Sequence, residues 1–325
     1  MEQLIETAFT RQFAVRHPVV LAPMDRISDG CLAAEVTRAG GFGIIGAGYG
    51  DRDWIDKAFA DAQGQRVGIG VITWSLLKKP DLVDHILDSK PAAVFVSFGD
   101  GEPIIRAAKE RSIPTIWQVQ RLDQAEQALK AGADILVAQG QEGGGHGMER
   151  GLMALLPAVR DLAGKHQLIL AAGGIADGRG LAAALMMGAD GAMMGTRFWA
   201  SHEANGSGKA KDALVRAAGD DTRRTSFFDL ARGLDWPGEF TGRVVQNPFS
   251  HRWLDDPAKM QASQDTIRAA YDAADPDDFS VRALIAGEAL DLVRSVEPAA
   301  AIVQETVKEA ADLLAKAGSF LTDRD

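Results

Sequence analysis

A single histidine lies in the most glycine-rich loop of the chain. His146 stands between Gly145 and Gly147, within the stretch Gln139–Met148. Glycines offer an imidazole neither packing nor shielding, so a structural role in the core is disfavoured for this side chain. An accessible imidazole can take up and release a proton near neutral pH. The sequence therefore predicts that His146 is a catalytic base.

Two further glycine clusters have the composition of an anion-binding site. Gly173 and Gly174 are adjacent, and Gly195 directly precedes Thr196. Where glycines follow a strand, bare backbone N–H groups and the start of the next helix can face a phosphate. The two clusters predict a phosphorylated cofactor or substrate. The alternative is that these glycines only permit tight turns between strand and helix.

The elements that would carry these loops alternate between strand and helix. Eight short apolar runs, bounded by Gly, Pro or charged residues, are typical of buried strands, and stretches of helical spacing such as 123–131 and 178–187 lie between them. Such alternation is typical of a parallel sheet covered by helices, and a (β/α)8 TIM barrel is its simplest closure. The runs are Pro18–Ala22, Gly41–Ile45, Val67–Ile72, Ala92–Ser97, Ile113–Val119, Ala133–Ala138, Leu168–Ala172 and Gly191–Met194.

The spacing of these runs places the histidine loop. Most successive runs start 20 to 26 residues apart, whereas the sixth and seventh start 35 residues apart. The surplus is the loop that contains His146. Because this loop follows a strand, we expect it at the carboxyl end of the barrel, where barrel enzymes carry their active sites.

Two other motifs, which would indicate a dinucleotide site and a metal site, have weaker support in the sequence. The stretch Gly41–Gly46 fits G-x-G-x-x-G, but it lies within an apolar run, whereas a dinucleotide-binding fingerprint follows a strand and opens a helix. The acidic pairs Asp220–Asp221, Asp255–Asp256 and Asp277–Asp278 have no histidine at ligand spacing, so we expect solvated surface and no metal there.

Composition excludes several classes of function. The 325 residues carry 35 Lys and Arg against 45 Asp and Glu, a net charge of −10, and the basic residues form no run that would bind nucleic acid. The single cysteine, Cys31, cannot form an internal disulfide, which favours a cytoplasmic protein. The stretch Met1–Glu6 lacks the features of a signal peptide, so we expect residue 1 to be the mature start. No apolar run reaches the ~18 residues of a membrane span.

The chain resembles the flavin-dependent nitronate monooxygenases, formerly called 2-nitropropane dioxygenases, and most closely their class I. Matching elements run almost from end to end, and the histidine loop is the most specific of them. They are Leu21–Met24, Ala39–Gly43, Gly68–Trp74, Val96–Asp100, Gln139–Gly147, Ala171–Gly178 and Met194–Phe198, followed by Trp236–Pro237, Gly242–Arg243, Asn247 and Trp253. Gly143 and Met148 depart from the usual family residues, Ala and Gly, which puts the substrate pocket beside the histidine in question.

This resemblance implies an FMN-dependent oxidoreductase that holds FMN noncovalently. It would oxidise alkyl nitronates, and neutral nitroalkanes as a further substrate class, with O2 to carbonyl compounds and nitrite. His146 would be the base that removes a substrate α-proton. The cofactor-binding residues carried across are Ala22, Pro23 and Met24 along the flavin ring, Gly70, Gln118, Gln139 and Gly140 at its polar edges, and Gly173, Gly174, Gly195 and Thr196 at its phosphate.

After Phe198 the alternation stops. Residues 211–280 are polar, mainly helical in pattern and interrupted by prolines. The resemblance implies that they form a small cap over the flavin, while residues 1–210 and 281–325 form the barrel and Val281–Leu321 is an amphipathic helix that completes its outer ring. The alternative is a helical extension used for contact in a homodimer.

Two other functions stay open. A flavin-dependent enoyl-thioester (enoyl-ACP) reductase, or an NAD(P)H-dependent flavin oxidoreductase, would share the histidine and phosphate loops but take electrons from a nicotinamide cofactor. A noncatalytic flavin- or phosphate-binding barrel is the rival of a different class, and the exposed glycine loop around His146 disfavours it.

Overall fold

Eight parallel strands form the central sheet of the computed structural model, which describes residues 5–320. Each overlaps one of the eight predicted apolar runs, with bounds that differ by a few residues. The strands pair in the order β1-β9-β8-β6-β5-β4-β3-β2. Their bounds are β1 Val19–Leu21, β2 Ile44–Gly46, β3 Gly68–Ile72, β4 Val94–Ser97, β5 Thr115–Val119, β6 Ile135–Gln139, β8 Leu168–Ala172 and β9 Gly191–Met194.

The two end strands of this order meet and close the sheet. Val20 of β1 forms a parallel bridge to Phe42, which lies just before β2. The Phe42 N–H donates to the carbonyl oxygen of Val19 at 2.9 Å, and the Leu21 N–H donates to the carbonyl oxygen of Phe42 at 3.0 Å. The other side of β1 pairs with β9, with Val20 opposite Met193. The predicted TIM barrel is therefore confirmed.

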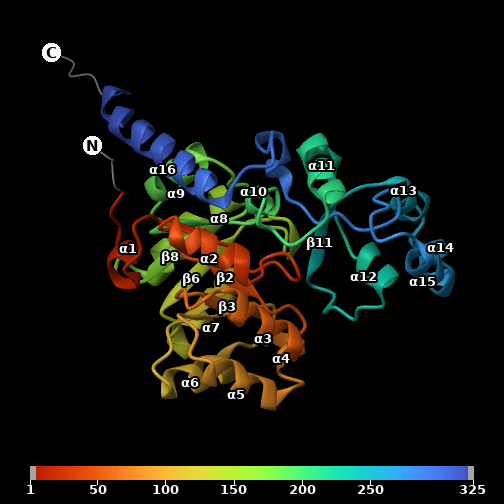
Figure 1. Cartoon of the computed structure of the whole chain (residues 1–325), viewed down its shortest axis with the longest axis horizontal. Helices are drawn as coiled ribbons and strands as arrows, with labels where there is room; N and C mark the ends of the chain where they lie inside the picture. The colour runs from red at the N-terminus through yellow and green to blue at the C-terminus, as the bar shows by residue number, and fades with distance from the viewer. Residues whose placement is uncertain (1–4, 321–325) are drawn as a thin grey trace.

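A ring of helices surrounds the barrel (Figure 1). The last of them, α16, packs on α9 and α2 and so fills the gap between the end and the beginning of the ring. Its contact with α9 is close, because a Cβ added at Gly178 would lie 2.4 Å from the backbone nitrogen of Ala310. The ring is α2 Gly30–Arg38, α3 Arg52–Asp61, α5 Pro80–Asp88, α6 Glu102–Glu110, α7 Leu122–Ala131, α8 Leu152–Ala163, α9 Gly178–Met186 and α16 Ala299–Lys316.

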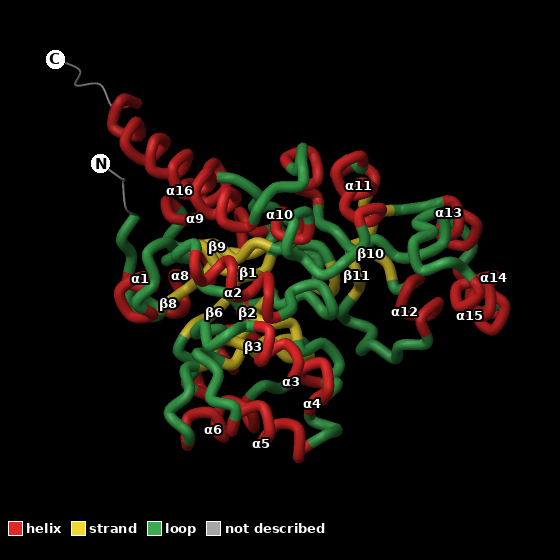
Figure 2. Tube along the Cα trace, viewed as in Figure 1, coloured by secondary structure: helices red, strands yellow, loops and turns green. Residues whose placement is uncertain are grey.

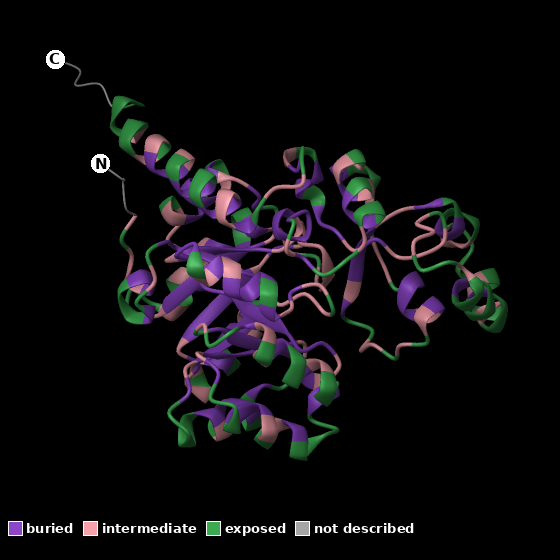
Figure 3. Cartoon of the chain, in the orientation of Figure 1, coloured by how far each residue is buried: buried purple, intermediate pink, exposed green. Residues whose placement is uncertain are grey.

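The interior of the barrel is filled with apolar side chains, and its amino-terminal end is plugged. Helix α1 (Ala8–Phe13) places Phe9 and Phe13 there, stacked at 5.1 Å, with the ring of Phe42 edge-on to Phe13 at 5.3 Å. These side chains belong to one buried cluster with Phe95 and Met193 of the strands. Figure 3 shows the strands as a buried layer inside partly exposed helices. The carboxyl end is thus the side left for a site.

A second region follows the barrel strands and has a small core of its own. It contains α11 Gly208–Arg216, α12 Phe227–Arg232, α13 Pro248–Leu254, α14 Pro257–Ala262 and α15 Gln264–Ala273, as well as β10 Thr222–Thr225 and β11 Thr241–Val245. Phe227, Phe228, Phe249, Ile267 and Tyr271 are among the side chains buried in its core. The two strands, seen in Figure 2, are additions to the expected helical cap. β10 pairs antiparallel with β11, and β11 pairs antiparallel with β7 (Gly145–Gly147), which is part of the histidine loop.

The prediction of one continuous helix from Val281 to Leu321 is wrong. The helix begins at Ala299, and the only helical turn between 281 and 298 is the short 3-10 helix η2 (Glu288–Leu292). The preceding backbone is held by tertiary contacts: the Gly287 N–H donates to Oγ1 of Thr196 at 2.9 Å, and the Glu288 N–H donates to the carbonyl oxygen of Glu142 at 2.9 Å. Leu321 lies outside the described residues.

Short helical turns complete the chain: α4 Thr73–Leu76, α10 Thr196–Trp199, η1 Gly219–Asp221 and η3 Ala317–Phe320. Across residues 5–320, no helix combines the length and apolarity that crossing a membrane would require. The first four residues, on which the expectation of a start without a signal peptide partly rests, lie outside the described part of the chain.

Candidate active site

A pocket lies at the carboxyl ends of the barrel strands, between them and the second region. It holds about 1340 Å³ of empty space, part of it open to solvent. Its lining contains all the predicted site residues except Gly140: Ala22, Pro23, Met24, Gly70, Gln118, Gln139, His146, Gly173, Gly174, Gly195 and Thr196. The fold therefore brings together side chains and glycines from six strands, or from the residues that directly follow them, and from one long loop.

Gly140 lies beside the pocket and packs away from it. Its N–H donates to the carbonyl oxygen of Ala172 at 2.8 Å. A Cβ at this position would lie 2.6 Å from the backbone nitrogen of Leu152, at the start of α8. The close approach of the loop to α8 therefore accounts for this glycine.

The glycines after β8 and β9 form a wall of bare backbone. Gly173 and Gly174 have φ values of +101° and +72°, which side-chain-bearing residues rarely adopt. A Cβ added at Gly195 would meet only Cβ of Ala22 at 3.5 Å and Sδ of Met24 at 3.7 Å. A Cβ at Gly195 would therefore make only ordinary van der Waals contacts, and Gly195 faces the pocket.

Gly70 serves a different purpose on the barrel side. A Cβ at this position would lie 2.2 Å from Cβ of Pro23. The bare backbone of β3 thus admits the Pro23 ring to the pocket wall.

Two glutamines line the pocket, and their side-chain amides differ in hydrogen bonding. The side chain of Gln118 is buried, and among the described residues its Nε2 has no hydrogen-bond partner. A buried amide donor without a partner costs about 1–3 kcal/mol, so this atom requires an acceptor from a ligand or water. Gln139 is already engaged: its Nε2 donates to the carbonyl oxygen of His146 at 3.3 Å, and its Oε1 accepts from Gln120.

His146 is held by a carboxylate from the second region. Its Nε2 lies 3.0 Å from both Oδ1 and Oδ2 of Asp229, which belongs to α12. Both side chains are largely buried, with exposed fractions of 10% and 8%. Because an ionised carboxylate only accepts hydrogen bonds, it assigns the proton of a neutral imidazole to Nε2 and leaves the lone pair on Nδ1. This is the orientation that an Asp gives to a catalytic His in a triad.

An indole covers one face of this imidazole. The rings of His146 and Trp236 lie parallel, 3.4 Å apart with an angle of 5° between their planes. Trp236 also lines the pocket, together with Phe98 and Tyr49. Its Nε1–H donates to Oη of Tyr49 at 2.9 Å.

Two arginines, the buried Arg243 and the partly buried Arg224, hold the backbone of the histidine loop. Nη1 of Arg224 and Nε of Arg243 both donate to the carbonyl oxygen of Gln141, at 3.2 and 2.9 Å, and Nη2 of Arg224 donates to that of Thr241 at 2.7 Å. Burial, followed by the nearby charge of Arg243, lowers the pKa of Arg224 to about 10. Arg243 forms an ion pair with Glu288 at 2.7 Å. Charge-assisted hydrogen bonds thus help to fix the loop, in addition to its packing.

A carboxylate and a guanidinium face the pocket from its two sides. Asp25 follows β1 and Arg232 ends α12, and both belong to the lining. Burial raises the pKa of the Asp25 carboxyl above its ordinary value, although the positive charge of Arg232 opposes this rise. Burial likewise raises the pKa of Tyr49.

Sequence reasoning missed Asp229, and it gave Trp236 no role. Asp229 lies 83 residues from His146 in a polar segment, and no local pattern distinguishes it from the other acids there. Trp236 was part of the matched motif Trp236–Pro237. Attention to the aromatic residues of the second region could have singled out Trp236, but not Asp229.

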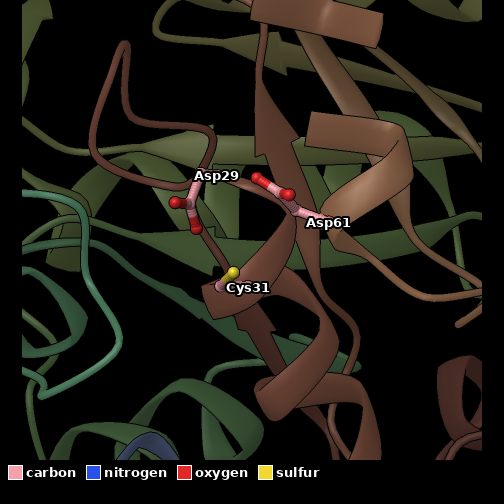
Figure 4. Close-up of side chains that lie close together, drawn as sticks. All are labelled: Asp29, Cys31 and Asp61. Carbon is pink, nitrogen blue, oxygen red and sulfur yellow. The ribbon is translucent and has the colours of Figure 1, made fainter. Parts of the chain in front are cut away.

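A separate cluster of possible metal ligands lies outside the barrel. Figure 4 shows Asp29, Cys31 and Asp61, which the packing of α2 on α3 brings together. Asp29 caps α2 by accepting the Leu32 N–H at 3.0 Å, and Asp61 accepts from Nζ of Lys57. Existing partners explain both carboxylates, so we assign no metal to this cluster.

The sequence matches a known family over most of its length. The family model for nitronate monooxygenase matches residues 70–309. A nitronate monooxygenase from Neurospora crassa is 29% identical, over 94% of this chain and 92% of that protein. The nitronate monooxygenase npaC from Metarhizium robertsii is 34% identical, over 91% of each.

Solved structures share the whole fold. FabK from Thermotoga maritima superposes with a TM-score of 0.85 at 29% identity and covers 98% of this chain and 100% of its own. A nitroalkane oxidase from Streptomyces ansochromogenes gives a TM-score of 0.76 at 26% identity and covers 97% of this chain and 100% of its own.

Proposed function

The chain belongs to the nitronate monooxygenase family, which indicates an oxidoreductase, and we propose that it oxidises alkyl nitronates with O2 to carbonyl compounds and nitrite. Neutral nitroalkanes are the proposed second substrate class. The observation that carries the proposal is the largely buried His146–Asp229 pair, which lies in the same pocket as the glycine wall. The structural likeness to a nitroalkane oxidase supports it.

The pocket suits noncovalently bound FMN. The unpartnered Nε2 of Gln118 offers a hydrogen bond to a polar edge of the ring system. The open space at Gly195, beside the left-handed turn at Gly173 and Gly174, suits a phosphate that contacts bare backbone. The Thr196 hydroxyl accepts from Gly287 and so keeps its own proton to donate. Bound FMN would supply the electron acceptor for the substrate and the electron donor to O2.

His146 would act only on the neutral substrate. The α-proton of a nitroalkane would move to Nδ1, and the C–H electron pair would stay on the substrate, which becomes the nitronate anion. The imidazole becomes an imidazolium, and the adjacent Asp229 carboxylate stabilises its charge. The glycine loop leaves the imidazole accessible from the pocket, while Asp229 and Trp236 occupy its Nε2 edge and one face.

The second region would be a cap that completes the pocket. We retain residues 1–210 and 281–325 as the barrel and 211–280 as the cap. The separate core around Phe227, and the contribution of Asp229, Arg232 and Trp236 to the site, support this division. We also retain a cytoplasmic location, for which the single cysteine is the support.

One experiment tests the function against its rivals. The purified protein is given ethyl nitronate while oxygen uptake and nitrite release are followed, and in parallel it is mixed with NADH or NADPH without oxygen. We expect oxygen uptake with the nitronate and no rapid bleaching of the flavin by the nicotinamides. Rapid bleaching would identify a reductase, and a lack of turnover with either reagent would identify a noncatalytic barrel.

A further inference from the structure

The segment Gly233–Phe240 crosses from α12 to β11 and carries Trp236 at its centre. Two polar contacts tie this segment to loops of the barrel. Nε1 of Trp236 donates to Oη of Tyr49 at 2.9 Å, and the carboxylate of Glu239 lies 3.7 Å from Nη1 of Arg121. The segment therefore bridges the two sides of the pocket.

Trp236 is the centre of an aromatic cluster, and its contact with His146 differs from all the others. Phe98, Tyr49, Trp74 and Phe240 meet the indole edge-on, at ring distances from 5.1 to 6.4 Å and angles from 71° to 80°. The imidazole alone lies flat on it. Edge-on neighbours fix the plane of the indole, and the stack then fixes the plane of the imidazole.

This arrangement constrains both the base and the space in front of it. The Asp229 contact determines which edge of the imidazole faces away from the substrate, whereas the indole determines the tilt of the ring about that contact. The indole also belongs to the pocket lining, beside Phe98 and Tyr49. A substrate carbon positioned for Nδ1 would extend its alkyl chain along this aromatic wall.

We propose that Trp236 is both the positioning residue for His146 and the side chain that limits the length of the substrate's alkyl group, so that the pocket takes short-chain nitronates and nitroalkanes. This inference rests on the proposed function, because it concerns the substrate of the same site. The stacked indole occupies volume that a longer alkyl chain would need. A methylene group that a pocket accepts or rejects changes specificity by roughly 10–200-fold, which makes chain length a sensitive readout.

The test compares chain-length profiles. kcat/KM is measured for ethyl, butyl and hexyl nitronate with the parent, Trp236→Ala, Trp236→Phe and Trp253→Phe. Trp253 also lies in the second region but is not in the pocket lining. Trp253→Phe therefore shows what the loss of an indole outside the pocket does to the chain-length ratio. We expect Trp236→Ala to raise the hexyl-to-ethyl ratio at least about tenfold, Trp236→Phe to give an intermediate ratio, and Trp253→Phe to keep the parent's ratio.

A second measurement addresses the stack itself and needs no turnover. The six histidines are labelled with ¹³C, and the ring C–H signals of His146 are identified by their loss in His146→Asn. We expect them upfield in the parent, because they lie over the indole ring, and displaced downfield in Trp236→Leu, whereas Trp253→Phe leaves them in place.

The outcomes separate the two claims. A parent inactive on every nitronate overturns the proposed function together with this inference. An active parent whose chain-length ratio is the same in Trp236→Ala, or whose His146 signals do not move in Trp236→Leu, overturns the inference alone. If Trp236→Ala does not fold, two other measurements test the inference: the hexyl-to-ethyl ratio of kcat/KM in Trp236→Phe, and the position of the His146 ring signals in Trp236→Leu.

Discussion

The two sides of the pocket are built from different materials. At the ends of β8 and β9, the barrel side presents bare backbone, at Gly173, Gly174 and Gly195. The side formed by the second region presents side chains, namely Asp229, Arg232 and Trp236. A backbone wall needs only a strand that ends at the right place. A side-chain wall also needs the register of another sheet and the rotation of a helix, so it depends on more of the fold.

The supports of the two sides differ in the same way. The barrel wall continues from a closed sheet whose interior residues are almost fully buried. The histidine loop joins the second region through β7, where His146 lies opposite Gly242 of β11. A Cβ at Gly242 would approach the imidazole to 3.6 Å, and Arg224 and Arg243 donate hydrogen bonds to the loop carbonyls. We therefore expect changes on the barrel side to affect cofactor binding, and changes on the other side to affect the chemistry.

The largest expected effect is on proton abstraction. A positioned general base contributes ~10²–10⁴-fold, so His146→Asn should lower turnover of a neutral nitroalkane by about that factor. A nitronate has already lost its α-proton, and its oxidation should stay within about tenfold of the parent. Oxygen uptake and nitrite release measure both rates. Equal losses on the two substrates would instead indicate that His146 binds the nitro group.

The carboxylate behind the histidine should have the next largest effect. Asp229→Asn removes the negative charge that stabilises the imidazolium, so nitroalkane turnover should fall by roughly 10–10²-fold, part of what the base supplies, with less change for the nitronate. Asp235→Asn changes an exposed acid of the same region and serves as the control. Unchanged nitroalkane turnover in Asp229→Asn would remove the pair from the mechanism.

On the barrel side, Gly195→Val should reduce cofactor binding and leave the fold intact. A Cβ here stays 3.5 Å or more from protein atoms, an ordinary contact distance, so we expect the added side chain to disturb the ligand more than the fold. Losing one backbone contact worth about 1.4 kcal/mol lowers affinity about tenfold. Flavin released on denaturation is measured per protein, with circular dichroism as the check on folding. Gly208→Val, with open space around its Cβ, is the control, and full flavin content in Gly195→Val would show that the phosphate lies elsewhere.

The smallest effect concerns the charge that faces Arg232 across the pocket. Because burial raises the pKa of Asp25, its ionised form costs stability at neutral pH, and this cost disappears as the pH falls below the ordinary value of 3.8. Asp25→Asn should therefore raise Tm at pH 7 and have little effect near pH 3.

Asp51 is the comparison, because its pKa is shifted in the opposite direction to that of Asp25. Its pKa is lowered, chiefly by the Trp54 N–H and then by Arg26, so its charge stabilises the fold at neutral pH and this contribution is lost on acidification. Asp51→Asn should lower Tm at pH 7. A lower Tm for Asp25→Asn as well would mean that attraction to Arg232 outweighs the cost of burial.

Much of the barrel was predictable because its signals are local. Each buried strand is a short apolar run with glycine or charge at its ends, and the surplus of residues before Leu168 placed the histidine loop at the carboxyl end. The strands β10 and β11 were not predicted. They carry arginines and threonines in place of an apolar alternation. β11 is stabilised by pairing with β7 and β10 by pairing with β11, and arginines of both strands donate to a carbonyl oxygen of the histidine loop.

The sequence by itself determined the barrel, the glycine turns and the identity of the loop histidine, although this side chain is largely buried and not exposed as expected. Only the tertiary structure decided that Asp229 faces Nε2 of that histidine and that Trp236 lies flat on its ring. It also decided that the segment 281–298 contacts the histidine loop and does not continue the helix that begins at Ala299. The physical reason is the distance along the chain over which each interaction acts. Hydrophobic periodicity and glycine conformation act over a few neighbouring residues, whereas a carboxylate 83 residues away becomes a partner only when sheet register and helix packing bring the two side chains together.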